Sequence, residues 1–410
     1  MRLSAQAGAS SFLPLYALAN LGAHVGFMPL IVLLLPRRVE ALAPLGKVEL
    51  LSWLLLVGGI VASLAHILAG HAGDRWLARR GNRRGLIALG LAALVGAYGL
   101  LGLAQDRLLL VIAVILFQAA LNLMFAPLGA LLADHVEDRR KGLAAGMLNL
   151  ALPLSGLVVT LLGLWSARDS ALPFLVVALL ITLMVAPVLL AWPGGLKLHP
   201  DDRAAVEKQA PARADLPRNF ALAFAARLLV QLGAAVMLGY LYFYVESIAG
   251  ATADFPPGNA SRGVAHLSLI ATIASLLTGL VAGQVSDMLN RRRLPLVLAA
   301  LVCAASLGAL ATLDDWRAIV IAYALFVASL TAFLSIDSAM VAQLVGREPR
   351  RGALLGVMNL TNTLPAIIAP GLTLAYGALV LSSRLFDALL LTTAAAALVA
   401  AALIARIRIA

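Results

Sequence analysis

The chain has 410 residues, of which 62% are hydrophobic and only 12% are charged, and its mean hydropathy is +0.96. Soluble domains are about half apolar and about a quarter charged, so this composition excludes an ordinary water-soluble protein. The single cysteine, Cys303, excludes a disulfide scaffold. The net charge of +11 comes from basic residues between long apolar stretches, which indicates membrane orientation rather than nucleic-acid binding.

The apolar stretches are about 20 residues long or longer, enough to cross roughly 30 Å of hydrocarbon as helices. Strands of a membrane barrel are about 10 residues long and alternate in polarity, and these stretches do neither. The first stretch is too long and too deep for a removable signal peptide. The sequence therefore predicts an all-α membrane protein with twelve transmembrane helices, at 12–35, 49–71, 85–105, 108–132, 143–165, 171–192, 218–247, 263–286, 294–313, 316–344, 353–380 and 385–405.

The basic residues are distributed unevenly between the predicted loops. With the N-terminus in the cytoplasm, 22 of the 31 lysines and arginines lie on the cytoplasmic side and 8 on the other, and Arg227 lies within a span. Because cytoplasmic loops carry the excess of basic residues, this bias predicts cytoplasmic N- and C-termini.

A charged, proline-containing segment at 193–217 is predicted to be a cytoplasmic linker between two six-helix halves, 1–192 and 218–410. The halves repeat each other. Gly70-His-Ala-Gly-Asp74 returns as Gly283-Gln-Val-Ser-Asp287. A Gly-Asn motif, Gly142-Leu-Ala-Ala-Gly146-Met-Leu-Asn149, returns at nearly the same offset as Gly352-Ala-Leu-Leu-Gly356-Val-Met-Asn359. Such duplication predicts two bundles that rock around a substrate site near the bilayer midplane, as in secondary transporters.

These motifs resemble the major facilitator superfamily, and the resemblance covers the whole chain. The superfamily's signature between its second and third helices stands here as Gly70-x3-Asp74-Arg75-x3-Arg79-x-Gly81-x-Arg83-Arg84. The long spacing to the second glycine is similar to the glycoside–pentoside–hexuronide cation symporters and the sucrose-transporter-like permeases. The resemblance implies the major facilitator fold of two pseudo-symmetric bundles, with helices 1, 4, 7 and 10 lining a central cavity.

Acidic residues at the predicted cytoplasmic ends of helices are candidates for a gate. A carboxylate there can accept from a helix N-terminus or pair with an arginine, and the contact can break in the other state. Asp287, followed by Met288 instead of arginine, would form the weaker latch. The expected gating residues are Asp74, Arg75, Asp134 and Asp287, while Arg79, Arg80, Arg83 and Arg84 are interpreted as membrane-surface anchors.

Two charged residues lie deep inside predicted spans. Arg227 is about 16 Å from the inner end of the seventh helix, and Asp337 is about 12 Å from that of the tenth. An arginine at that depth costs about 2.5–3.5 kcal/mol to insert, so it is expected to face a cavity or a buried acid. The implied arrangement of the superfamily makes Arg227 and Asp337 natural partners. They either bind substrate or carry the coupling proton, or they form a fixed structural ion pair that steadies the C-terminal half.

Neutral polar side chains near mid-depth suit a hydroxyl-rich ligand such as a sugar, although interhelical hydrogen bonding is the alternative. Asn20 and His24 lie one turn apart, as do Gln118 and Asn122. Tyr240 is a candidate for stacking on a sugar ring. His66, His71 and His266 are interpreted as structural. The predicted substrate-binding residues are Asn20, His24, Gln118, Asn122, Arg227, Gln231, Tyr240, Asn359 and Asn362.

The branch resemblance implies cation-binding carboxylates on the first helix and in the middle of the fourth, and this chain has neither. That departure favours proton coupling through Asp337 over a sodium site. Phosphate-binding loops, nucleophile elbows and zinc motifs are missing from the sequence, so we expect neither an enzyme nor a cofactor or metal.

The sequence therefore predicts a secondary active transporter that binds no nucleic acid and acts as a monomer in the cytoplasmic (inner) membrane. Its predicted cargo is a small hydroxylated solute, sugar- or glycoside-like, moved with protons by alternating access. Two alternatives stay open. One is a proton-driven exporter of drugs or amphipathic metabolites, and the other is a non-transporting membrane protein that assembles or delivers pigments or lipids.

Overall fold

The computed structural model describes residues 2–136, 138–165, 171–192, 216–249, 254–256, 259–289, 292–345 and 351–407. It gives no description of the side chains of residues 2–11, 133, 138–142, 282–289, 351–353 and 382. The described residues form helices and short connections, and none of them forms a strand. The predicted all-α class is confirmed.

Eleven helical segments in the described ranges are long and apolar enough to cross a membrane. The first, Phe12–Leu42, is formed by the later part of α1 (Arg2–Val25), a π-helical turn at Leu30–Leu34 and α2 (Leu35–Leu42). The others contain α3 (Lys47–Arg80), α4 (Arg84–Leu103), α5 (Arg107–His135), α6 with α7 (Asp138–Asn149 and Ala151–Leu164), α8 (Leu172–Leu190), α9 (Leu216–Ala249), α10 (Ala260–Leu289), α11 (Arg293–Leu310), α12 (Trp316–Val345) and α15 (Leu385–Ala405).

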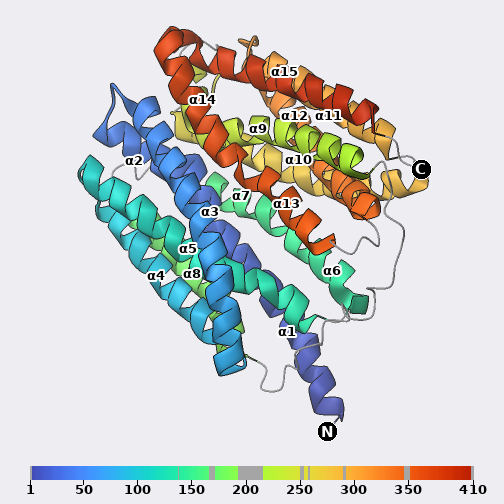
Figure 1. Cartoon of the computed structure of the whole chain (residues 1–410). Coiled ribbons are helices and arrows are strands. Elements are labelled where there is room, and N and C mark those ends of the chain that lie inside the picture. The colour runs from blue at the N-terminus through green and yellow to red at the C-terminus, as the bar shows by residue number, and fades with distance from the viewer. Residues whose placement is uncertain are drawn as a thin grey trace. The chain divides into compact units, whose positions relative to one another are not determined.

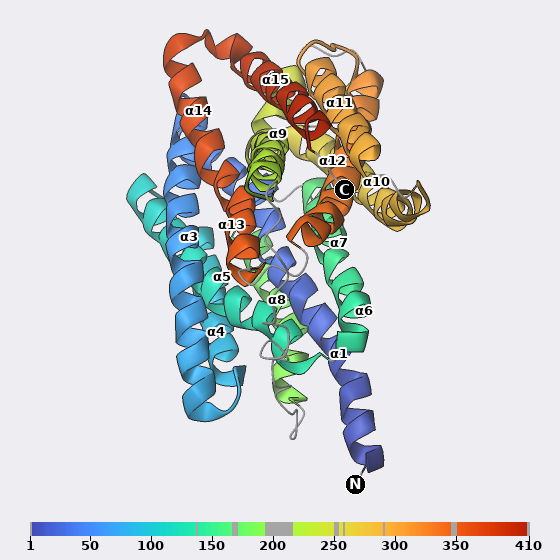
Figure 2. The same ribbon diagram turned by 45° about the vertical axis from the view of Figure 1, so that its right-hand side comes forward.

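The predicted span at 353–380 differs from the expectation, because it is divided into α13 (Arg351–Thr363) and α14 (Pro365–Leu379). The two helices meet at Leu364 (Figures 1 and 2). Pro365 has no backbone N–H, so it cannot donate to the carbonyl of Thr361 and its ring crowds that carbonyl. Neither half alone is long enough to span a bilayer, and this region is not among the eleven segments.

The predicted span at 143–165 is interrupted in the same way, where α6 ends at Asn149 and α7 begins at Ala151. Pro153 stands four residues after Asn149 and removes the donor to its carbonyl. Both interruptions therefore follow from a proline just after the repeated Gly-Asn motif.

The helices form two compact units, residues 1–200 and 201–410. In the first unit, α5 packs against α3 and α4, and α8 packs against α1 and α4. In the second unit, α12 packs against α10 and α11, and α15 packs against α9 and α11. The two lists correspond helix for helix along the repeat, so the duplicated sequence folds into duplicated packing. The expected linker, 193–217, lies outside the described residues apart from 216 and 217.

Close packing of α4 on α5 depends on a glycine. A Cβ at Gly90 would lie 2.5 Å from the backbone nitrogen of Met124, a separation that side chains do not reach. A Cβ at Gly96, on the same helix, would meet no atom within 4 Å. The backbones of α4 and α5 therefore approach each other more closely at Gly90 than any larger residue permits.

We expect Gly90→Ala to lower the free energy of unfolding by about 1–3 kcal/mol, because the two helices must separate to admit the methyl group. Gly96→Ala is the matched control and should leave stability unchanged or raise it, since alanine favours helix. Thermal unfolding of both variants in detergent measures the difference. Equal melting temperatures for the two variants would contradict the close contact.

Candidate functional site

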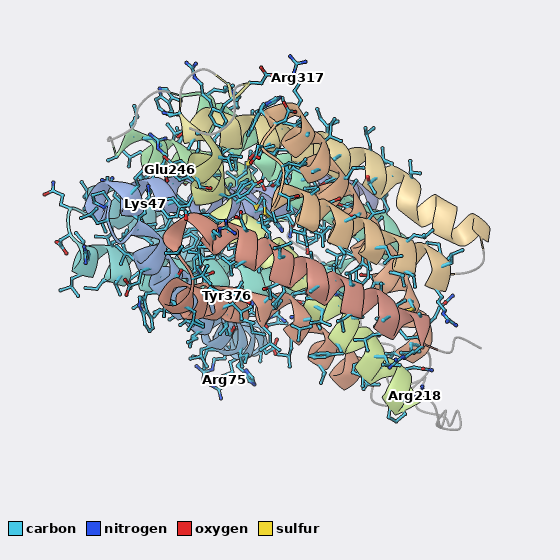
Figure 3. The ribbon with its side chains drawn as sticks, turned by 90° about the horizontal axis from the view of Figure 1, so that it is seen from above. Lys47, Arg75, Arg218, Glu246, Arg317 and Tyr376 are labelled. Atoms are coloured by element: carbon cyan, nitrogen blue, oxygen red, sulfur yellow. The ribbon has the colours of Figure 1, made fainter. Side chains whose placement is uncertain are left out.

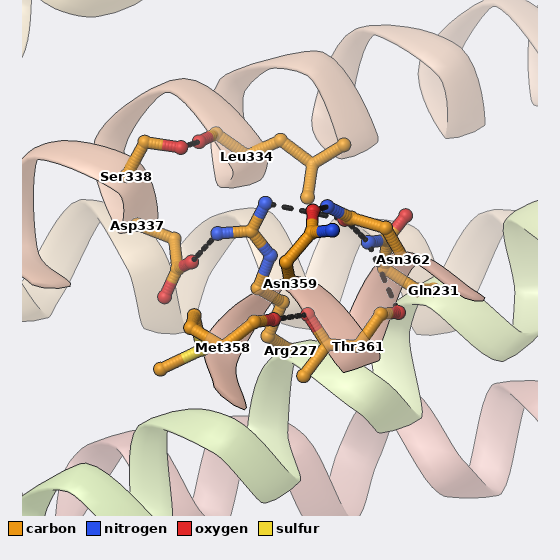
Figure 4. A network of polar contacts seen from close by, with 9 residues as sticks. All are labelled: Arg227, Gln231, Leu334, Asp337, Ser338, Met358, Asn359, Thr361 and Asn362. Atoms are coloured by element: carbon orange, nitrogen blue, oxygen red, sulfur yellow. Dashed lines mark hydrogen bonds and ion pairs between the residues drawn. The ribbon is translucent and has the colours of Figure 1, made fainter. Parts of the chain in front are cut away.

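A group of polar side chains lies where α9, α12 and α13 of the second unit meet, with Asp337 buried and Asn359 and Asn362 exposed. Arg227 and Gln231 come from α9, Asp337 from α12, and Asn359 and Asn362 from α13 (Figure 4). We call these five residues the C-terminal polar cluster. All five were predicted from the sequence as substrate or coupling residues, and the structure brings them together.

The centre of the cluster is an ion pair. Nη1 of Arg227 donates to Oδ2 of Asp337 at 3.1 Å. The side chain of Asp337 is 2% exposed and that of Arg227 is 14% exposed. Two charges this far from solvent are tolerated because each compensates the other, and removing one leaves the other without a partner.

The amide side chains extend the pair into a network. Nη2 of Arg227 donates to Oδ1 of Asn362 at 3.3 Å, and the same oxygen accepts from Nε2 of Gln231. Nδ2 of Asn362 in turn donates to Oδ1 of Asn359 at 2.8 Å. Nε of Arg227 is buried and has no hydrogen-bond partner among the described residues. The network therefore leaves one guanidinium N–H open to an acceptor.

Gln231 also connects the cluster to the interruption of the eleventh predicted helix. Its Nε2 donates to the backbone carbonyl of Thr361 at 3.3 Å. This is the carbonyl that Pro365 leaves without its helical donor. A side chain of the cluster thus satisfies the backbone group released by the proline. Sequence reasoning missed this link, although the spacing of Thr361 and Pro365 was a visible signal.

The predicted residues of the first unit form a separate set of contacts on α1, α3 and α5. The ring of His24 donates from Nδ1 to the carbonyl of Asn20 at 2.9 Å and lies edge-on to Phe125, with centroids 5.4 Å apart. Nδ2 of Asn122 donates to the carbonyl of Gln118 at 2.9 Å. Asn20 and Gln118 are each 7% exposed. The one-turn pairs expected from the sequence are thus hydrogen-bonded within their own helices.

Tyr240 is placed differently from the other predicted substrate residues. Its side chain is only 1% exposed, and its ring lies 6.5 Å from that of Phe386 in α15. This surrounding is typical of helix packing within the second unit.

A second charged cluster lies where α3, α4 and α5 meet. Arg83 donates from Nη2 to Oδ1 of Asp74 at 2.9 Å and from Nε to Oδ2 of Asp134 at 2.6 Å. Arg83 is 5% exposed, and it lies against Gly73, where a Cβ would be 2.7 Å from its Nη1. We call Asp74, Arg83 and Asp134 the Arg83 cluster. The interpretation of Arg83 as a surface anchor is wrong, because one guanidinium bridges two acids and is buried by them.

The electrostatics of Arg83 follow from this geometry. Burial by itself favours the neutral guanidine, but the hydrogen bonds and charges of Asp134 and Asp74 outweigh it and raise the pKa of Arg83 above its ordinary value. Arg83 therefore stays charged at every physiological pH.

The remaining gating candidates are not part of this cluster. Arg75 is exposed, and its side chain extends away from the ribbon (Figure 3). The side chain of Asp287 lies outside the described residues. Among the residues that the structure describes, no group of three or more His, Cys, Asp or Glu side chains could hold a metal ion.

The chain matches the sequence model of the Major Facilitator Superfamily over residues 3–370. It belongs to this superfamily. The protein is therefore a multi-pass membrane transporter and not an enzyme. No curated protein sequence matches it significantly.

Solved structures of transporters share its fold. A bacterial homologue of the human lysosomal transporter Spinster, inward-facing and unoccupied, aligns over 98% of this chain and 99% of its own, with 14% identity and a TM-score of 0.66. A POT family transporter in complex with 5-aminolevulinic acid aligns over 96% and 95%, with 12% identity and a TM-score of 0.73. A POT family transporter in complex with a thioalcohol-conjugated peptide aligns over 96% of this chain and 95% of its own, with 13% identity and a TM-score of 0.74.

Arg83→Ala should lower the free energy of unfolding by about 2 kcal/mol, because the largely buried carboxylate of Asp134 loses a charged donor. Arg83→Lys should recover only part of this, since an ammonium group cannot bridge two acids as a guanidinium does. Arg79→Ala, at an exposed position on α3, is the control. Melting curves in detergent compare the three. A loss for Arg83→Ala no larger than for Arg79→Ala would contradict the bridge.

Asp337→Asn should destabilise the protein by about 3 kcal/mol, because the guanidinium of Arg227 cannot lose its charge when its partner is removed. Arg227→Gln should cost less, since a carboxylate left alone can take up a proton. The double variant should recover most of the loss. Asp314→Asn, at an exposed position before α12, is the control. Unfolding in detergent measures all four, and simple additivity of the two single changes would exclude the coupling.

Proposed function

We propose that the protein is a secondary active transporter that moves a small hydroxylated solute, sugar- or glycoside-like, together with protons by alternating access. The observation that carries the proposal is the buried Arg227–Asp337 pair, with its amide neighbours and its open Nε. The amide side chains and the unpaired Nε–H support a binding role, because both can hydrogen-bond a polar solute.

The ion pair supplies a mechanism for coupling. While Asp337 is ionised, its carboxylate holds one face of the Arg227 guanidinium. A proton on Asp337 removes that charge, so the guanidinium becomes available to oxygen atoms of a solute. Proton and solute then favour each other's binding, and this reciprocity is what links their movement across the membrane.

The chemistry of the cluster favours a neutral solute rich in oxygen. The guanidinium and the Gln231 and Asn359 amides are suited to donate to hydroxyl and ring oxygens and to accept from hydroxyl groups. The similarity of the Gly70–Arg84 signature to the glycoside and sucrose branches supports the same class. The POT relative whose structure contains 5-aminolevulinic acid raises a carboxylate-bearing solute as the comparison to test, since a carboxylate would also engage Arg227.

We further propose that the protein is a monomer in the cytoplasmic (inner) membrane, with both termini in the cytoplasm and residues 193–217 as a linker between two six-helix bundles. The excess of basic residues in the predicted cytoplasmic loops supports the orientation.

The test is uptake of labelled glucose, xylose, sucrose, methyl β-glucoside and 5-aminolevulinic acid into proteoliposomes, with and without an inward proton gradient. We expect accumulation of a neutral sugar or glycoside that depends on the gradient. Asp337→Asn should abolish gradient-driven accumulation while exchange of solute across the membrane continues, and Asp314→Asn should behave as wild type. Because Asp337→Asn also destabilises the protein, folded protein in each preparation is quantified.

Other outcomes identify the alternatives. Protection of cells against toxic amphipathic compounds, without sugar uptake, would identify an exporter. Neither uptake nor protection would favour a protein that assembles or delivers pigments or lipids. Accumulation with an unchanged pH profile in Asp337→Asn would remove the coupling role and keep the transport function.

A further inference from the structure

His66 is an exposed polar side chain of α3, and it lies on a different side of the helix from the exposed apolar side chains. The large apolar side chains that α3 exposes, among them Leu64, Ile67 and Leu68, follow one side of the helix. At 100° per residue His66 lies nearly opposite that side, in line with Gly59 and Gly73, both of which are buried. The exposed ring therefore belongs to the side of α3 that packs on α5, and not to its apolar exposed side.

The hydrogen bonds of Asn122 determine which ring nitrogen of His66 carries the proton. Nδ2 of Asn122 donates to the Gln118 carbonyl, so its Oδ1 is the atom that faces His66, 3.1 Å from Nδ1 of the ring. An amide oxygen can only accept, so Nδ1 of His66 carries the proton in this contact. The neutral imidazole then has an unprotonated Nε2, which is a hydrogen-bond acceptor.

His66 lies at the level of Asn122, a residue predicted to bind solute, because their side chains are hydrogen-bonded. Asp74 follows it on α3 by eight residues, or about 12 Å, and Asp134 follows Asn122 on α5 by twelve residues, or about 18 Å. His66 is therefore well inside the membrane-spanning part of α3.

A second ring lies on the neighbouring side of α5. His24 of α1 contacts Phe125, which is one turn after Asn122. Its Nδ1 is also the donor of its hydrogen bond, to the Asn20 carbonyl, so its Nε2 is likewise the acceptor in the neutral ring. Two imidazole acceptors thus flank the same turn of α5.

We propose that Nε2 of His66 is a binding group for a hydroxyl of the transported solute, in a subsite of the first unit formed with Asn122. The subsite rests on the proposed function and belongs to the first unit by itself, where His66 supplies a hydrogen-bond acceptor. A neutral solute with hydroxyl groups can donate to this acceptor, whereas a solute without hydroxyl or N–H donors leaves Nε2 unpaired.

The chain contains a matched control. His71 is also an exposed histidine of α3, its Nδ1 donates to the Ile67 carbonyl of its own helix at 2.9 Å, and it lies on the apolar exposed side. His66→Asn keeps an amide near Nδ1 that can donate to Asn122 but removes Nε2. His66→Gln instead places an amide oxygen near Nε2.

We expect His66→Asn to raise the KM for the accumulated sugar roughly three- to tenfold, the effect of one lost hydrogen bond, with Vmax within about twofold of wild type. His66→Gln should recover part of the affinity, and His71→Asn should leave KM unchanged. Equal KM values for His66→Asn and His71→Asn, with wild-type transport intact, would overturn the subsite and leave the proposed function standing.

A second measurement does not need transport. Diethyl pyrocarbonate modifies unprotonated imidazole nitrogens, and peptide mass spectrometry reads each histidine separately. We expect reaction at His66 in proteoliposomes, slowed at least threefold by a saturating solute of the sugar panel, whereas reaction at His71 is not slowed. A His66 that does not react, or that no panel solute protects, would overturn the subsite. Absence of uptake by wild type, with protection at His66, would instead refute the proposed transport function alone.

Discussion

A charge inside a membrane-spanning helix must have a partner, and that requirement organises the polar interior of this protein. Arg227 would cost several kcal/mol in hydrocarbon on its own, but it is hydrogen-bonded to Asp337 from another helix. The pair fixes α9 against α12. It also explains why amides gather nearby, because the remaining guanidinium N–H groups need acceptors that apolar side chains cannot supply.

The Arg83 cluster obeys the same rule at the edge of the membrane-spanning segments. One buried guanidinium joins acids from α3 and α5 while standing just before α4. The difference is in the surroundings: Asp74 is 74% exposed, whereas Asp337 is 2% exposed. Water can therefore replace the contact of Asp74 at small cost, as a gate requires, but it cannot replace that of Asp337. Exchange with water is therefore a route for breaking the contact of Asp74 and not that of Asp337.

The C-terminal polar cluster is linked to a backbone carbonyl that a proline leaves without its helical donor. Each unit has an interrupted helix after the repeated Gly-Asn motif, at Leu150 and at Leu364. In the second unit the released Thr361 carbonyl is satisfied by Gln231, a member of the cluster. Any solute that takes the Gln231 amide competes with that backbone bond, so binding and the geometry at the junction of α13 and α14 share one donor. This is a local link of the kind that alternating access needs.

Composition, span length and the internal repeat were enough to predict an all-α, duplicated membrane protein. The reason is that hydrocarbon permits only backbone arrangements that satisfy every polar backbone group internally. The depth of Arg227 and Asp337 could be read in the same way, since helical rise converts residue number into distance. Side-chain direction could not. That Arg83 rather than Arg75 bridges the acids, that Asn122 turns its oxygen to His66, and that Gly90 admits Met124 depend on how helices are rotated against each other. Rotation is decided by packing between segments far apart in the chain, and only the tertiary structure contains it.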